Sequence, residues 1–126
     1  MERRVVIVAG FGFRHGAGLP SLRAAFVLAQ QGRVPVTQLV TVSDKTAALA
    51  PLAALLGLPL TGVPADVLAC AATLTRSAAS LAAWGTGSVA EACALTAAGP
   101  GARLLGPRCI SSDRMATCAL AEGFVS

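Results

Sequence analysis

The chain has 126 residues, of which 55% are hydrophobic and only 13% are charged. A chain of this length buries one sizeable core and leaves no room for a second, so we expect a single domain over residues 1–126. The mean hydropathy of +0.70 is high, but every apolar run is interrupted before the roughly 18 residues that a membrane span requires. We therefore expect no membrane partner, and without a signal-peptide pattern the predicted location is the cytoplasm.

The net charge of +4 comes from nine arginines and one lysine set against six acidic residues. Arginine favours bidentate recognition of carboxylates and phosphates, whereas no dense basic run with interleaved aromatics indicates nucleic acid as a partner. The four cysteines form no C-x-x-C pair and share the chain with one histidine. We expect buried free thiols, with no metal site and no cofactor.

The first part of the chain reads as alternating strands and helices, punctuated by glycine and proline. In order, we expect a strand at Val5–Ala9, a glycine-rich turn at Gly10–Gly16, a helix from Pro20 that ends at Gly32, a strand at Leu39–Val42, a helix at Pro51–Leu56, a strand at Leu58–Thr61 and a short helix at Pro64–Ala71.

The second part begins with a Ser-, Thr- and Ala-rich segment at 72–84, which we interpret as a loop over the site. A helix opened by Gly85–Glu91 then runs to about Ala98, and two strands follow at Arg103–Leu105 and Met115–Leu120, separated by an irregular loop with Arg108. The alternation predicts an α/β fold whose parallel or mixed sheet carries helices on both faces.

Two glycine-rich turns each precede a helix N-terminus, where free N–H groups favour an anion. In the first turn, Gly10, Gly12 and Gly16 let the backbone approach a ligand, and Arg14 adds a bidentate donor. Such turns gather at the carboxyl edge of the strands, so we expect the two turns to face one pocket.

The second turn offers Gly85, Thr86, Gly87, Ser88 and Glu91 as further ligand-binding residues. An alternative explains Ser88 and Glu91 without a ligand, because S-x-x-E is a capping box. A nucleotide-binding module is a weaker alternative: the third glycine of a dinucleotide fingerprint is replaced by His15, and no Gly-Lys-Ser/Thr occurs.

Three side chains are candidates for chemistry. His15 can act as a general acid or base near neutral pH, or merely hydrogen-bond within its loop or to a ligand. Asp44 and Lys45, which follow a predicted strand, can bind and activate polar substrate groups; equally, Asp44 suits a helix N-cap with Lys45 as its solvated neighbour. His15 and Asp44 are the candidate catalytic pair.

Four stretches, taken together and in order, resemble the CobE/CbiG C-terminal domain family of cobalamin (vitamin B12) biosynthesis. They are G-x-G-x-R-H-G at 10–16, T-V-S-D-K at 41–45 with a proline-led helix after it, L-G-L-P at 56–59 and G-T-G-S-V-A-E at 85–91. The resemblance covers nearly the whole chain. It implies a three-layer α/β/α fold with a mixed, mostly parallel sheet of about five strands.

In this family the domain either stands alone, as in CobE, or follows other domains in CbiG, which opens the ring lactone of cobalt-precorrin-5A and releases acetaldehyde. This chain resembles the stand-alone type. Phe13 and His15 stand where the CbiG turn often has Cys and Arg or Lys, so a catalytic cysteine does not carry over.

The resemblance implies a tetrapyrrole ligand, a precorrin or hydrogenobyrinic-acid intermediate, and enzymes of the cobalamin pathway as partners. Such ligands are apolar macrocycles fringed with carboxylates, which suit arginines and helix N-termini. We expect a carrier or accessory factor that binds the ligand around Arg14, His15, Asp44, Lys45, Thr86 and Ser88. The alternative is a lactone hydrolase in which His15 or Asp44 activates water.

Overall fold

The computed structural model describes residues 4–32, 35–70 and 88–125. Strands and helices alternate in the first part of the chain, and antiparallel strands close it. The elements are β1 (Arg4–Phe13), α1 (Leu19–Gln30), β2 (Gln38–Val42), the 3₁₀ turn η1 (Ser43–Lys45), α2 (Thr46–Leu56), β3 (Leu60–Val63), the 3₁₀ segment η2 (Ala65–Cys70), α4 (Val89–Ala98), β4 (Arg103–Leu104), β5 (Cys109–Ile110) and β6 (Ala116–Val125).

The strands form one mixed sheet in the order β3-β2-β1-β6-β4, and β5 also pairs with β6. Among the described strands, β1 with β2 and β2 with β3 are parallel, whereas β6 is antiparallel to β1, β4 and β5. The expected mixed sheet is confirmed, but parallel pairing is confined to β1–β3 instead of dominating. The reason is connectivity: helices link the first three strands, and short loops link the last three.

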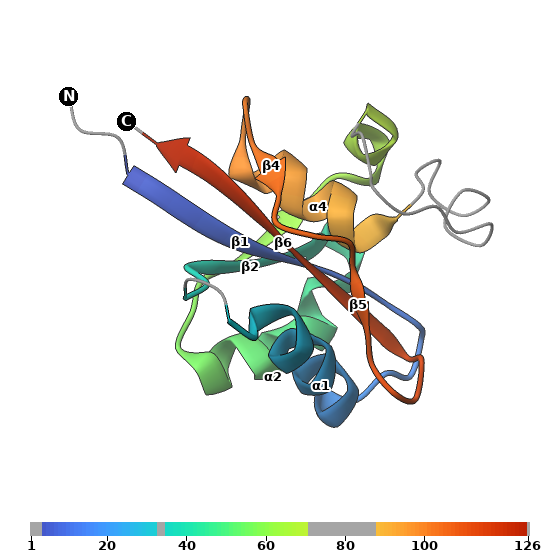
Figure 1. The fold of residues 1–126 in the computed structure, drawn as a ribbon. Coiled ribbons are helices and arrows are strands. Elements are labelled where there is room, and N and C mark those ends of the chain that lie inside the picture. The colour runs from blue at the N-terminus through green and yellow to red at the C-terminus, as the bar shows by residue number, and fades with distance from the viewer. Residues whose placement is uncertain (1–3, 33–34, 71–87, 126) are drawn as a thin grey trace.

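Helices cover both faces of the sheet, which confirms the expected three layers. Figure 1 shows α1 and α2 on one face and α4 on the other. Residues of β1 alternate between the two cores, as the strand period requires: Ile7, Ala9 and Phe11 face α1 and α2, and Val8 faces α4.

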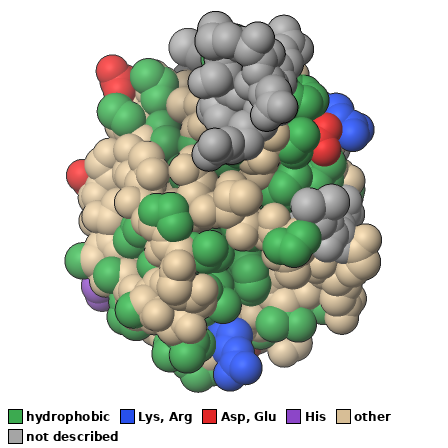
Figure 2. All heavy atoms as spheres, turned by 90° about the vertical axis from the view of Figure 1, so that its left-hand side faces the viewer, with side chains coloured by type: hydrophobic (Ala, Val, Ile, Leu, Met, Phe, Trp, Pro, Cys, Tyr) green, Lys and Arg blue, Asp and Glu red, His purple; other side chains and the backbone are tan. Residues whose placement is uncertain are grey.

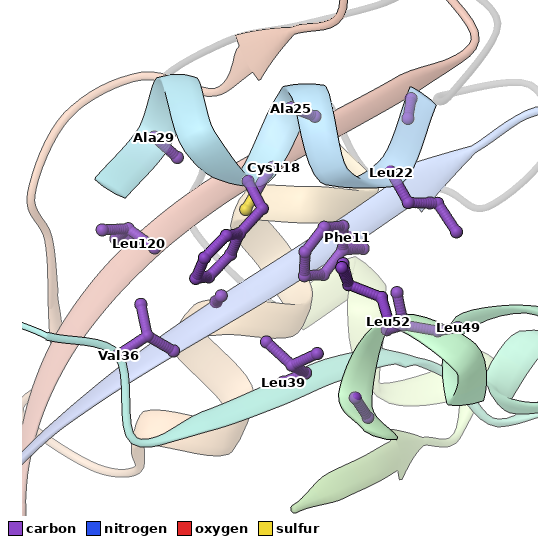
Figure 3. Packing of buried hydrophobic residues seen from close by; sticks show 14 of the residues in the cluster. Phe11, Leu22, Ala25, Ala29, Val36, Leu39, Leu49, Leu52, Cys118 and Leu120 are labelled. Atoms are coloured by element: carbon purple, nitrogen blue, oxygen red, sulfur yellow. The ribbon is translucent and has the colours of Figure 1, made fainter. Parts of the chain in front are cut away.

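Phe11 lies at the centre of the core beneath α1 and α2 (Figure 3). Its ring stacks with that of Phe26, with centroids 6.4 Å apart and planes 15° apart. Leu22 from α1 and Leu49 and Leu52 from α2 complete the surroundings, all 0–1% exposed. This core fixes the central strand, and with it the position at which β1 ends.

Four element boundaries differ from the prediction. β1 continues through Gly10–Phe13 because β6 pairs with it over its whole length. α2 begins at Thr46 and contains Pro51, which cannot donate the usual hydrogen bond to the Ala47 carbonyl. β3 lies two residues later than expected, and β6 extends to Val125.

Two further details correct the prediction. The loop expected around Arg108 contains β5, a two-residue strand on the edge of β6. Within the segment expected to be helical at 64–71, Ala65–Cys70 form a 3₁₀ helix. The predicted loop at 72–84 lies outside the described residues.

The surface retains much apolar area. On the face turned to the viewer in Figure 2, charged side chains lie mainly toward the edges, and hydrophobic side chains reach the surface between them. Val5 and Phe124, which are register partners on β1 and β6, are each about half exposed.

Candidate functional site

The ends of β1 and β2 meet the start of α4. A Cβ atom added to Gly12 would lie 3.2 Å from Val89 Cβ and 3.4 Å from Ala90 N, and Lys45 Nζ donates a hydrogen bond to the Phe13 carbonyl. Parallel strands bring their carboxyl ends to one edge, which is where α/β sheets place ligands. We call the region formed by residues 13–16, 43–45 and 88–90 the carboxyl edge.

The first turn is shorter than predicted and carries its polar residues outside the sheet. Arg14, His15 and Gly16 are exposed. Arg14 N donates to Met115 O at 2.9 Å, and Ala17 N donates to Arg14 O at 3.0 Å, which closes the turn. Gly16 has φ +89°, a conformation that glycine adopts without strain. The turn thus presents Arg14 and His15 to solvent on a fixed backbone.

Gly10 and Gly12 are strand residues that face α4, which corrects their assignment to the turn. A Cβ atom on Gly10 would overlap the Ala90 carbonyl oxygen and lie 2.6 Å from Ala94 N. These glycines let the helix approach the strand closely. Their presence is explained by packing against α4.

Lys45 anchors the end of β1. Besides its bond to the Phe13 carbonyl, its Nζ lies 5.0 Å from the centroid of the Phe13 ring. Partial burial lowers the pKa of the Lys45 ammonium, because desolvation disfavours its charge. Of the two alternatives considered for Lys45, the merely solvated neighbour is not observed.

Asp44 lies exposed in η1. The N-cap of α2 is Lys45, and no side chain caps that helix, so the capping role considered for Asp44 is not observed. Within the described residues, no hydrogen bond or ion pair joins Asp44 to His15. The two candidate catalytic groups therefore share the carboxyl edge without forming a dyad.

The second turn is described only from Ser88 onward; Gly85, Thr86 and Gly87 lie outside the described residues. Ser88 Oγ caps α4 by accepting a hydrogen bond from Glu91 N at 3.3 Å. Glu91 is 0% exposed, and its Oε2 accepts from Arg108 N at 2.8 Å. The serine half of the predicted capping box is confirmed, and the Glu91 carboxylate also holds the loop before β5.

The structure reveals one polar cluster that the sequence prediction missed, which we call the Asp113 clasp. Its carboxylate accepts hydrogen bonds from Ser111 Oγ at 2.6 Å, from Met115 N at 3.0 Å and from Ser21 Oγ. The bonds from Ser111, Ser21 and Met115, in that order, lower the pKa of the Asp113 carboxyl. Ser-Ser-Asp between two apolar runs is a turn signal, but nothing local indicates that it joins α1.

Three of the four cysteines, at positions 93, 109 and 118, agree with the expectation of free thiols. Cys93 and Cys118 are buried, Cys109 is half-buried, and none of the three is in a disulfide. Burial raises the pKa of Cys93 to about 12 and raises that of Cys118 well above its ordinary value. Across the described ranges, no three His, Cys, Asp or Glu side chains gather in a way that would hold a metal ion.

A membrane-spanning helix is not found either: each helix in the described part of the chain is too short or too polar to cross a bilayer.

Comparisons with known proteins identify the family to which the chain is similar. The family model described as "Cobalamin synthesis G C-terminus" matches residues 7–121. A search of the curated proteins found no match. Among solved structures, CobE, a protein from the cobalamin (vitamin B12) biosynthetic pathway, is similar with a TM-score of 0.83 and 34% identity, over 94% of this chain and 90% of that one.

Two further structures extend the comparison. The cobalamin biosynthesis protein chiG from Agrobacterium tumefaciens str. C58 has a TM-score of 0.67 and 34% identity, over 92% of this chain and 97% of that one. A cobalamin biosynthesis protein G homolog from Sulfolobus solfataricus has a TM-score of 0.70 at 15% identity, over 94% of this chain and 37% of the other, and shares the fold. The chain therefore belongs to the cobalamin synthesis G C-terminal family and is a protein of cobalamin biosynthesis.

Proposed function

We propose that this protein binds a corrin-ring precursor, a precorrin or hydrogenobyrinic-acid type intermediate, and acts as a carrier or accessory factor for other enzymes of cobalamin biosynthesis. The observation that carries the proposal is the carboxyl edge, where exposed Arg14 lies on the turn after β1 and α4 begins beside the same strand. Family membership supplies the pathway, and the chemistry of this edge supplies the ligand class.

The residues of this edge suit carboxylates. The Arg14 guanidinium offers two parallel N–H donors, and the N-terminus of α4 adds the positive end of a helix dipole. His15 can donate to a ligand oxygen from the same turn. Gly85, Thr86 and Gly87 directly precede α4 in the chain and remain predicted ligand contacts.

Binding is favoured over hydrolysis by the surroundings of the candidate catalytic groups. His15 is exposed, and among the described residues no carboxylate orients its ring. Lys45 is engaged with the end of β1, which makes it a positioning residue for the turn. A general base usually needs an orienting partner to hold it against water.

The test is a titration of the purified chain with hydrogenobyrinic acid, followed by visible absorption and then by mass spectrometry of the recovered pigment. We expect a saturable spectral change and an unchanged mass. A corrin whose side-chain carboxylates are converted to amides is the matched control and should bind at least about ten-fold more weakly, because it loses the charge-assisted bonds.

Two results would contradict the proposal. The absence of any saturable change with hydrogenobyrinic acid would remove the ligand assignment. Conversion of more than one equivalent of a precorrin lactone per chain, detected by the mass of the recovered pigment, would make the protein an enzyme. Loss of that conversion in His15→Gln would identify His15 as the base.

A further inference from the structure

Helix α1 is apolar on two opposite sides. Its inner side packs into the core with Leu22, Ala25 and Phe26. On its outer side Leu19, Val27 and Leu28 are 37%, 48% and 43% exposed. A surface helix normally turns polar residues to solvent, and an apolar outer side marks a surface that is covered in use.

The outer side of α1 is hollowed into a groove of about 600 Å³. Leu19, Val27 and Leu28 line it together with Ser112 from the loop before β6, and Arg23 is its one charged lining residue. An apolar cleft with few polar groups is the usual form of a small-molecule site. The groove contains no acidic side chain to neutralise Arg23.

The Asp113 clasp fixes the end of this groove. Ser21 on α1 bonds to Asp113, so the loop that carries Ser112 is held against the helix. The same loop accepts a bond from Arg14 N through the Met115 carbonyl. The clasp loop therefore links the helix that carries the groove to the turn that bears Arg14 and His15.

The charge around this junction is positive. Arg14, Arg23 and Arg114 are all exposed on the turn, the helix and the clasp loop. The one acid among these elements, Asp113, already accepts three hydrogen bonds. Three arginines therefore outnumber the single carboxylate on the elements that the clasp joins, which favours an anionic ligand there.

We propose that the α1 groove binds the apolar ring face of a carboxylated macrocycle, with Arg23 pairing one of its carboxylates and Arg14 another. The assignment rests on the proposed function and adds where the ring lies. A ligand bound in this way buries the apolar outer side of α1, and its carboxylate neutralises the charge of Arg23.

Charge complementarity favours this ligand over a second copy of the chain. In a two-fold interface the same residues face each other, so Arg23 would meet another arginine or an apolar wall. Burying a cation without a partner is costly. A ligand that is apolar at its centre and anionic at its rim matches the groove on both counts.

The experiment measures the affinity of hydrogenobyrinic acid for Val27→Glu and Arg23→Ala, each beside a matched control. Leu55→Glu places the same charge on the outer side of α2, where Leu55 is 56% exposed. Arg103→Ala removes an exposed arginine that pairs with Glu122 away from the groove. We expect about ten-fold weaker binding or more in both groove variants, and less than about two-fold change in both controls.

The outcomes separate this inference from the proposed function. If the unmodified chain binds and both groove variants bind equally well, the groove assignment is wrong and the proposed function stands. If Val27→Glu changes the oligomeric state in solution and leaves the affinity for hydrogenobyrinic acid unchanged, the groove is an interface between copies of the chain. If the unmodified chain does not bind, both proposals fail together. Thermal melting of each variant shows that it is folded.

Discussion

Two buried glycines let α4 lie directly on the backbone of the sheet. Gly10 on β1 and Gly123 on β6 both face the helix, and a Cβ atom on either would overlap a carbonyl oxygen, that of Ala90 or Ala98. Backbone atoms cannot move aside as a flexible side chain can. The distance between helix and sheet, and so the position of the α4 N-terminus, depends on these residues.

Gly10→Ala should therefore destabilise the fold by about 3 kcal/mol, the upper range for adding a methyl group to a packed core. Gly18→Ala is the matched control, because Gly18 has φ −95° and its added Cβ would meet only Pro20 Cδ at 3.5 Å. Chemical denaturation of both variants measures the effect. Equal stability of the two would show that α4 does not press on β1.

Asp113 links stability to pH. Its hydrogen bonds hold the folded-state pKa below the ordinary value of 3.8, so the unfolded chain binds the proton more readily. The stabilisation is complete above pH 3.8 and is lost as the pH falls through the folded pKa. At neutral pH, Asp113→Asn should have a lower melting temperature than the unmodified chain. This difference in melting temperature, the gap, should narrow on acidification toward pH 3.

Melting curves from pH 7 to pH 3 measure this gap. Asp66→Asn is the control, since Asp66 is an exposed carboxylate in η2. A gap that stays constant over the whole range would mean that the clasp does not depend on the carboxylate charge.

At the scale of elements, the start of α4 depends on one buried hydroxyl. Ser88 is 0% exposed, and its Oγ accepts from Glu91 N. Ser88→Ala should cost about 1–2 kcal/mol, as loss of an N-cap does. Ser112→Ala, at an exposed serine, should leave the stability unchanged; urea unfolding compares the two, and similar midpoints would show that the cap contributes nothing.

The elements that the sequence predicted well are those whose signal is local. Val5–Ala9 and Leu39–Val42 are apolar runs, and Gly57 ends α2 in the left-handed conformation at φ +67°, as predicted. The end of β6 has no such signal, because Glu122 and Gly123 interrupt it. Its partner β1, more than a hundred residues away in the chain, makes it a strand.

Glycine was the main source of error, because the same residue marks a turn or a close approach. Gly16, with φ +89°, is a turn residue as predicted. Gly10 and Gly12 instead allow a close approach, because α4 packs against both of them. The sequence gives no local sign of this contact. The capping interpretation of Ser88 depended on neighbouring residues and is confirmed in part, whereas the Asp113 clasp joins Ser21 to a residue far along the chain and had no local signature.

At the scale of the whole molecule, the parallel and antiparallel halves of the sheet meet at the carboxyl edge. The parallel strands β1–β3 bring their carboxyl ends to one edge, and the antiparallel β6 runs back along β1 so that its start meets the same edge. Alternation in the sequence predicted this edge, and the position of Ser88 beside β1 agrees with it. The α1 groove could not be predicted, since it arises from the packing of the clasp loop against α1.

Net charge and local charge act together on an anionic ligand. The chain carries +4 overall, which favours the approach of anions at low salt and is screened over about 10 Å at 0.1 M ionic strength. Arg14→Ala removes one charge at the carboxyl edge and should weaken hydrogenobyrinic acid binding by roughly 1.5–3 kcal/mol, the scale of a charge-assisted hydrogen bond. Because Arg14 is exposed on its turn, melting should barely change.

Arg103→Ala removes the same charge elsewhere and should lower the affinity only through the weak long-range field. Titrations of both variants at two salt concentrations separate the contributions: added salt should abolish the effect of Arg103→Ala, while most of the Arg14→Ala effect persists, since a direct contact is screened much less. Unchanged affinity together with a large fall in melting temperature would instead make Arg14 a structural residue of the turn.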